Sequence, residues 1–137
     1  MAIQVRFPGG RRVDARVGEH CIRTDQTVEH GGAGAAPEPF DLFLASIATC
    51  AGIYVLGFCE ARRIPTAGIW LEQHDEVDPK THALRRVSLT VHLPPSFPEK
   101  YRDAVVRAAE SCKVKRTLLD PPEVAVRAEV AAIDRVA

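Results

Sequence analysis

The sequence predicts an α+β fold in which mainly antiparallel strands surround one long buried helix. Three observations support this fold class. Short stretches alternate apolar and polar residues, residues 42–59 form an uncharged apolar run, and an amphipathic helical pattern follows residue 96. The expected order of elements is βββ-α-ββ-α-β. At 137 residues, the chain is expected to form a single domain spanning residues 1–137.

The first two strands are expected to form a hairpin. The segments IQVRF (3–7) and RRVDARV (11–17) flank a Pro-Gly-Gly turn. Residues 18–37 are rich in glycine, alanine and polar residues, which predicts a strand end followed by a flexible loop. The GGAG stretch in this loop lacks the third glycine of a dinucleotide-binding fingerprint.

The long helix is expected to begin near Pro39 and to stop before Pro65. It would hold about 24 residues and measure roughly 36 Å. Its uncharged run reaches the lower limit for a membrane span. Serine, threonine and glycine within the run, and the amphipathic strands around it, favour a buried core helix instead.

A helix that is apolar on all sides must be covered on all sides. One small sheet and one further helix can cover only part of it. We therefore expect an intertwined homodimer in which the two long helices pack together.

The elements after the long helix are predicted from the same apolar periodicities. Residues 68–77 and 85–93 alternate as strands, and Val87, Leu89 and Val91 share one face. The second helix is predicted over residues 96–112, with Ser96 and Glu99 at the spacing of a capping box. The final strand is predicted over residues 124–130, and the basic cluster 113–116 is interpreted as a solvated face.

Composition excludes several classes of function. Eighteen basic and eighteen acidic residues cancel, so no overall field favours nucleic acid or an anionic membrane. The first residues lack the apolar core of a signal peptide, and four cysteines are too few for a small disulfide scaffold. A reducing, cytoplasmic location is the expectation.

The four cysteines stand at positions 21, 50, 59 and 112, without a Cys-x-x-Cys pair. A cysteine in an apolar helix is usually a small inert hydrophobic residue. Cys59 fits that description, since it lies about 180° around the helix from Cys50 and near the negative C-terminal end. Cys21 is expected in a strand end or loop and is interpreted in the same way.

Two motifs give Cys50 and Cys112 a different interpretation. The pattern Pro-x-x-Leu-x-x-Ala-x-x-x-x-Cys is matched by Pro39, Leu42, Ala45 and Cys50, and the second motif is CKVKRTL, beginning at Cys112. Together they resemble the OsmC/Ohr family of thiol peroxidases, in its less-characterised OsmC-like branch, and the predicted element order agrees along essentially the whole chain.

The resemblance implies that Cys50 attacks an organic hydroperoxide and becomes a sulfenic acid, which Cys112 resolves as a disulfide. An external dithiol, often of the lipoyl type and carried by a protein, would restore both thiols. No bound cofactor and no metal are implied.

The sequence departs from the peroxidase branch at one position. That branch has a glutamate ten residues before the first cysteine, where this chain has Phe40. The nearest carboxylate, Asp41, is expected to stabilise the helix N-terminus. The peroxidase branch also has an arginine in an early Gly-Gly-Arg turn. Gly9-Gly10-Arg11 resembles that turn, but a plain hairpin turn explains these residues equally well.

Two alternatives stay open. The chain can be a non-catalytic dimer that binds a small hydrophobic ligand, with Cys50 as core packing. A metal site using His20, Cys21 and a further ligand is the other alternative, which the spacing supports poorly.

Overall fold

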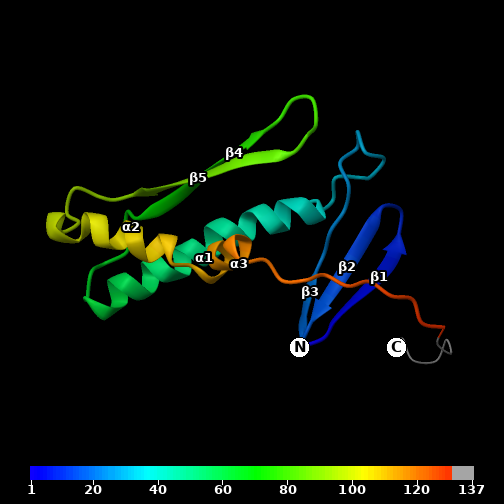
Figure 1. Ribbon diagram of the computed structural model, residues 1–137, viewed down its shortest axis with the longest axis horizontal. Helices are drawn as coiled ribbons and strands as arrows, with labels where there is room; N and C mark the ends of the chain where they lie inside the picture. Colours follow the sequence, from blue (N-terminus) through cyan, green and yellow to red (C-terminus); the bar gives the residue numbers. More distant parts are fainter. Residues whose placement is uncertain (131–137) are drawn as a thin grey trace.

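The computed structural model describes residues 1–130, which form an elongated molecule built along one central helix (Figure 1). The fold is α+β with antiparallel sheets, as predicted. The elements in chain order are β1 (Ile3–Gly9), β2 (Arg12–Val17), β3 (His20–Ile22), α1 (Pro39–Ala61), β4 (Trp70–Val77), β5 (Leu84–His92), the 3-10 turn η1 (Glu99–Tyr101), α2 (Arg102–Glu110) and α3 (Lys113–Leu119).

The first sheet has the strand order β1-β2-β3 and lies beyond the N-terminal end of α1 (Figure 1). The predicted hairpin is confirmed: β1 pairs antiparallel with β2, with Ile3 opposite Val17. Its turn uses Gly9 and Gly10, whose φ angles of 129° and 59° suit glycine. The register shifts between Arg6 and Gly9, where Pro8 has no N–H to donate.

Helix α1 confirms the predicted long helix and has defined ends. Pro39 stands in its first turn, where a missing N–H costs nothing, and the Asp41 carboxylate accepts a hydrogen bond from the Glu38 N–H at 2.9 Å. The expected role of Asp41 at the helix start is thus confirmed. At the other end, Arg63 adopts a φ of 54° and the Ile64 N–H donates to the Cys59 carbonyl, which completes a Schellman motif.

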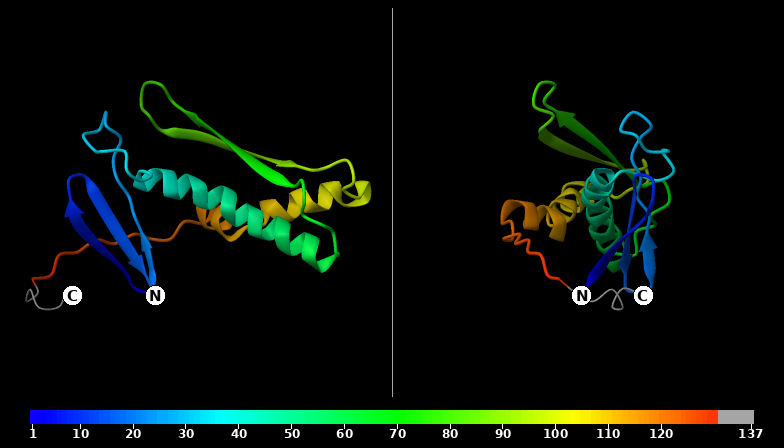
Figure 2. Two further views of the ribbon diagram at one scale, coloured as in Figure 1. Left: turned by 180° about the vertical axis from the view of Figure 1, so that it is seen from behind. Right: turned by 90° about the vertical axis from the view of Figure 1, so that its right-hand side faces the viewer.

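The hairpin of β4 and β5 runs along α1 (Figure 2). Leu71 pairs with Val91 and Gln73 with Leu89. The Gln73 side chain also donates to the Leu44 carbonyl of α1 at 3.1 Å. This contact ties the hairpin to the central helix and orients the apolar face of β5 toward the helices.

The second predicted helix is shorter than expected and is followed by another. The structure begins it with η1, whose N-cap is Pro98 without a side-chain hydrogen bond, so the capping box of Ser96 and Glu99 is wrong. Helix α2 ends at Glu110, and Cys112 starts α3. The basic cluster 113–116 therefore belongs to a helix that packs on α1.

The predicted strand over residues 124–130 is also wrong for this chain. Residues 121–130 form neither helix nor strand, and every one of them is exposed, with Val126 at 93%. The alternating valines provide one apolar face, but no described strand hydrogen-bonds to the segment. A strand without a ladder partner is not stable, which explains the difference.

Within the described residues 1–130, only one side of α1 is covered. The buried stripe consists of Ile47, Ala51, Val55 and Cys59, four residues apart. On another side, Ile53 is 58% exposed and Leu56 and Gly57 are exposed as well. By length and mean hydropathy α1 alone among the described helices is apolar enough to cross a membrane, a property shared with core helices, and only 22% of its most apolar window is buried in this chain.

Candidate functional site: two thiols beside one helical core

The structure brings three of the four cysteines to the same core. Cys112 and Cys59 are buried members of the main hydrophobic cluster, and half-buried Cys50 packs against this cluster. Cys21 is exposed on β3, in the N-terminal sheet. All four are free thiols. Cys50 and Cys112 are thus neighbours of one core although they are far apart in sequence.

Cys59 occupies a position that disfavours reaction. Its side chain is fully buried, and this burial raises the pKa of its thiol above the ordinary value, although nearby Arg62 acts in the opposite direction. A raised pKa leaves less thiolate at neutral pH and makes a weaker nucleophile. This agrees with the packing role expected for Cys59.

Cys112 is the N-cap of α3. Its sulfur accepts a hydrogen bond from the Lys115 N–H at 3.4 Å, and the Arg116 N–H donates to its carbonyl at 3.1 Å. Cys112 is buried, with 1% of the residue exposed. Its place is set by the start of α3, however, and not by the end of the preceding helix.

A side-chain hydrogen bond joins α3 to α1 close to both thiols. Arg116 Nη2 donates to the Tyr54 hydroxyl oxygen at 3.2 Å. Tyr54 lies one helical turn after Cys50, and Arg116 lies one turn after Cys112. Sequence reasoning missed this pair, because a lone tyrosine in an apolar run and an arginine in a basic cluster carry no spacing signal.

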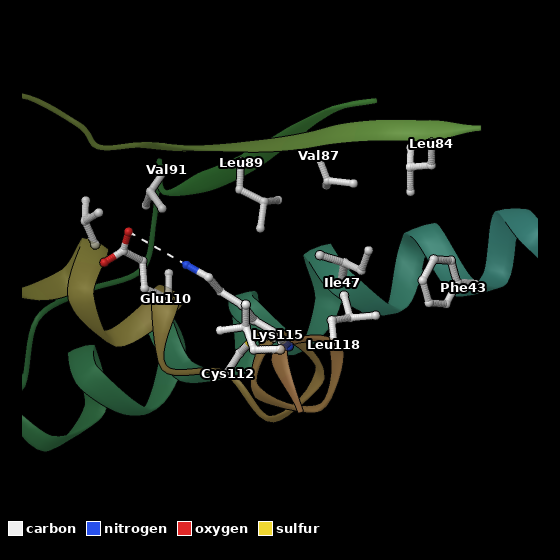
Figure 3. Close-up of a pocket in the computed structure, with 13 residues that line it drawn as sticks. Phe43, Ile47, Leu84, Val87, Leu89, Val91, Glu110, Cys112, Lys115 and Leu118 are labelled. Carbon is white, nitrogen blue, oxygen red and sulfur yellow. Dashed lines mark hydrogen bonds and ion pairs between the residues drawn. The ribbon is translucent and has the colours of Figure 1, made fainter. Parts of the chain in front are cut away.

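An apolar cavity of about 460 Å³ lies between β5 and the three α-helices. Figure 3 shows the side chains of Leu84, Val87, Leu89 and Val91 pointing from β5 toward the helices, which confirms their common face. Phe43 and Ile47 of α1 and Cys112 line the opposite side. An ion pair between Glu110 and Lys115, 3.9 Å apart, provides the charged groups of the lining.

A family model described as OsmC-like protein matches residues 31–127. The chain belongs to the OsmC-like family. No curated protein sequence matches it significantly.

Solved structures share the OsmC-like fold at low sequence identity. One, from Psychrobacter arcticus 273-4, is described as an osmotic stress induced and detoxification response protein; it has a TM-score of 0.73, 22% identity, and coverage of 85% of this chain and 87% of that chain. An OsmC-like protein from Mycoplasma pneumoniae has a TM-score of 0.69, 14% identity, and coverage of 88% and 87%.

A further structure, an organic hydroperoxide resistance protein OsmC from Legionella pneumophila, has a TM-score of 0.52 and 20% identity. The matched region includes 85% of this chain and 87% of that chain. At these identities the comparisons establish the common fold.

The residues that were compared with the glutamate and the arginine of the peroxidase branch make other contacts in this OsmC-like chain. Asp41 holds the start of α1, as described above. The Arg11 side chain lies beside Gly31 in the loop before α1. Phe40, at the position of the peroxidase-branch glutamate, stacks on Phe43 with ring centroids 5.4 Å apart.

The loop that leads into α1 is held by hydrogen bonds within itself. Buried Asp25 accepts hydrogen bonds through its carboxylate from the backbone N–H groups of Gln26, Ala33 and Ala35. These donors lower the pKa of Asp25, with Ala35 contributing most. The glycine- and alanine-rich stretch therefore wraps around a carboxylate of its own chain.

Within the described residues 1–130, no group of three or more His, Cys, Asp or Glu side chains is arranged to hold a metal ion. His20 and Cys21, the residues of the metal alternative, lie side by side in sequence on the exposed strand β3. The structure therefore supplies no third ligand beside them.

Proposed function

We propose that this OsmC-like protein reduces organic hydroperoxides with Cys50 as the peroxidatic thiol and Cys112 as the resolving thiol. The Cys50 thiolate attacks the distal oxygen of the hydroperoxide, so the O–O bond breaks and the product alcohol leaves with a proton. The resulting sulfenic acid then reacts with the Cys112 thiol. A disulfide forms and water departs.

An external dithiol completes the cycle. Thiol–disulfide exchange transfers two electrons from the dithiol to the Cys50–Cys112 bridge, and the dithiol leaves as a cyclic or linear disulfide. A lipoyl group on a protein is the proposed form of this reductant, in a reducing cytoplasm. No resident cofactor takes part in the proposed reaction.

The observation that carries the proposal is the common core of the two motif cysteines. Cys112 belongs to the buried cluster against which Cys50 packs, while Cys59 lies further along α1. Of the other two cysteines at this core, Cys112 is therefore the one on a different element from Cys50. Membership of the OsmC-like family supports the same pairing.

An apolar surrounding supports organic rather than inorganic peroxides as substrates. Buried Ile47 lies one helical turn before Cys50 on α1, and the cavity beside Cys112 is lined mainly by aliphatic side chains. An alkyl or aryl hydroperoxide gains free energy from leaving water for such a surface, whereas hydrogen peroxide does not.

A second copy of the chain is the proposed cover for the rest of α1. Ile53 and Leu56 are exposed on the central helix, and residues 124–130 have strand alternation without a ladder. Both features expose apolar surface that a soluble chain normally buries. An intertwined homodimer would cover both.

The test is single-turnover thiol loss with cumene hydroperoxide compared with hydrogen peroxide. Cumene hydroperoxide should react faster, and peptide mapping after one equivalent should find a Cys50–Cys112 bridge. Cys50→Ser should abolish both results, and Cys112→Ser should leave a sulfenic acid that a diketone probe traps. Cys59→Ser, a change on the same helix, is the matched control and should alter neither.

Equal, slow rates for both peroxides, or a mapped Cys21–Cys112 bridge, would overturn the proposal. The cavity then favours the second candidate function, binding of a small hydrophobic ligand by a non-catalytic dimer. Phe40 in place of a glutamate also fits that candidate. Binding would persist in Cys50→Ser, which separates the two functions.

A further inference from the structure

The hydrogen bond between Arg116 and Tyr54 lies where α3 meets α1 (Figure 1), close to both thiols of the proposed reaction. Cys50 and Tyr54 are four residues apart on α1, so their side chains project from adjacent turns of one flank. Cys112 and Arg116 are likewise four residues apart, and the backbone bond from the Arg116 N–H to the Cys112 carbonyl fixes that turn. The contact therefore joins the two helices one turn beyond each cysteine.

Helix α3 has few other attachments to the core. It has seven residues, of which Val114 is the half-buried one and the others are exposed. Its N-cap Cys112 is buried, but the sulfur of Cys112 has to leave the Lys115 N–H and turn toward Cys50 before a bridge can form. The orientation of α3 on α1 must persist while the sulfur moves.

We propose that Tyr54 and Arg116 are positioning residues for the resolving step, holding α3 on α1 so that Cys112 reaches the sulfenic acid on Cys50. This inference rests on the proposed function and deepens it. The step they assist joins the two sulfur atoms: the S–O bond of the sulfenic acid breaks, and the hydroxyl group leaves as water with the Cys112 proton. The attack of Cys50 on the peroxide precedes this step and does not need the hydrogen bond between Arg116 and Tyr54.

The test separates the two steps in Tyr54→Phe and Arg116→Gln. In single-turnover mixing with cumene hydroperoxide, loss of the Cys50 thiol should keep its wild-type rate in both variants. Closure of the disulfide should slow by about three- to tenfold, the upper value corresponding to about 1.4 kcal/mol. The fraction of sulfenic acid trapped by a diketone probe should rise in proportion.

A double variant and a matched control test whether Tyr54 and Arg116 act through their shared hydrogen bond. Tyr54→Phe with Arg116→Gln should close no more slowly than either single variant, because the same bond is removed once. Arg107→Gln removes a charge from the exposed face of α2 and should close at the wild-type rate. A general loss of packing would instead slow thiol loss and closure together and would lower Tm.

Diamide in place of the hydroperoxide tests the pair without peroxidase activity. Diamide forms an adduct on one thiol, which the second thiol displaces to form the disulfide. Slower closure in both variants with diamide supports the positioning role even if wild-type protein fails to reduce peroxides. Wild-type closure rates in Tyr54→Phe and Arg116→Gln with both oxidants would overturn it.

Discussion

The carboxylate of Asp25 accepts a hydrogen bond from the Ala35 N–H at 3.0 Å, across ten residues of loop. The Asp25 N–H in turn donates to the Pro37 carbonyl at 3.1 Å. These contacts hold the two ends of the loop together, immediately before α1 begins at Pro39. The direction in which the chain enters the cysteine-bearing helix is therefore fixed by one buried carboxylate.

Asp25 should make the stability of the protein depend on acidic pH. Its pKa is lowered in the folded state, so it stabilises the fold above its unfolded pKa of about 3.9 and loses this effect as pH falls through the folded value. Asp25→Asn should be less stable than wild type at pH 7, and the difference should shrink toward pH 3. Urea unfolding at several pH values measures it. Asp103→Asn on α2 is the control, and an unchanged difference across this range would contradict the role of Asp25.

Gly32→Ala should destabilise the same loop by steric conflict. An added Cβ would lie 2.0 Å from the carbonyl oxygen of Gln26, which is backbone and cannot rotate away. We expect a loss of about 2 to 3 kcal/mol in the free energy of unfolding. Gly52→Ala in α1 meets no atom within 4 Å and should gain up to about 1 kcal/mol through helix propensity. Equal stabilities of the two variants would argue against the loop conformation.

The elements predicted correctly are those whose signal lies within the element. The uncharged run fixed the position of α1, and alternation gave β1, β2, β4 and β5, because burial on one or all sides leaves a local period. Helix α3 has too few residues to show a period, and its attachment depends on Tyr54, far away in sequence. The wrong strand at 124–130 has a true apolar alternation, but a strand also needs a neighbour, which no local pattern supplies.

The residues of the candidate site also fall into those that a local sequence pattern predicts and those that it does not. Cys50 and Cys112 were found through motifs. The Asp25 contacts were missed because an aspartate and the N–H groups eight to ten residues later form no recognisable motif. Residues that act through backbone N–H groups are not visible in side-chain patterns.

His30 should titrate above its ordinary range because of Glu38. The two side chains form an ion pair of 2.8 Å, which raises the pKa of His30 above 6.5 and lowers that of Glu38. The pair contributes to stability below pH 6.5 and loses this contribution as pH rises through the folded pKa of His30. NMR titration of the imidazole measures the shift. Glu38→Gln should return the pKa of His30 toward its ordinary value; an identical titration in the variant would exclude the pair as the cause.

Wild-type protein should sediment as a dimer at low micromolar concentration if a second copy covers α1. Ile53→Glu should then cause dissociation, aggregation or unfolding, because the proposed interface would bury an unpaired charge. Ser88→Glu on the exposed face of β5 is the matched control and should leave the dimer intact. A stable, folded wild-type monomer would falsify the proposed assembly.

Exposure and the proposed chemistry favour different cysteines as the first to react. Cys21 is exposed and Cys50 is half-buried, so accessibility alone makes Cys21 the first thiol to react with any reagent. A neutral alkylating agent such as iodoacetamide should follow that order, with buried Cys59 and Cys112 reacting last. Cumene hydroperoxide should reverse the first two: Cys50 should be oxidised before Cys21, because the proposed site selects the peroxide. Mass spectrometry of the individual peptides over time gives both orders from one preparation. Preferential oxidation of Cys21, with Cys50 remaining a thiol, would show that exposure governs the reaction and that Cys50 serves as packing.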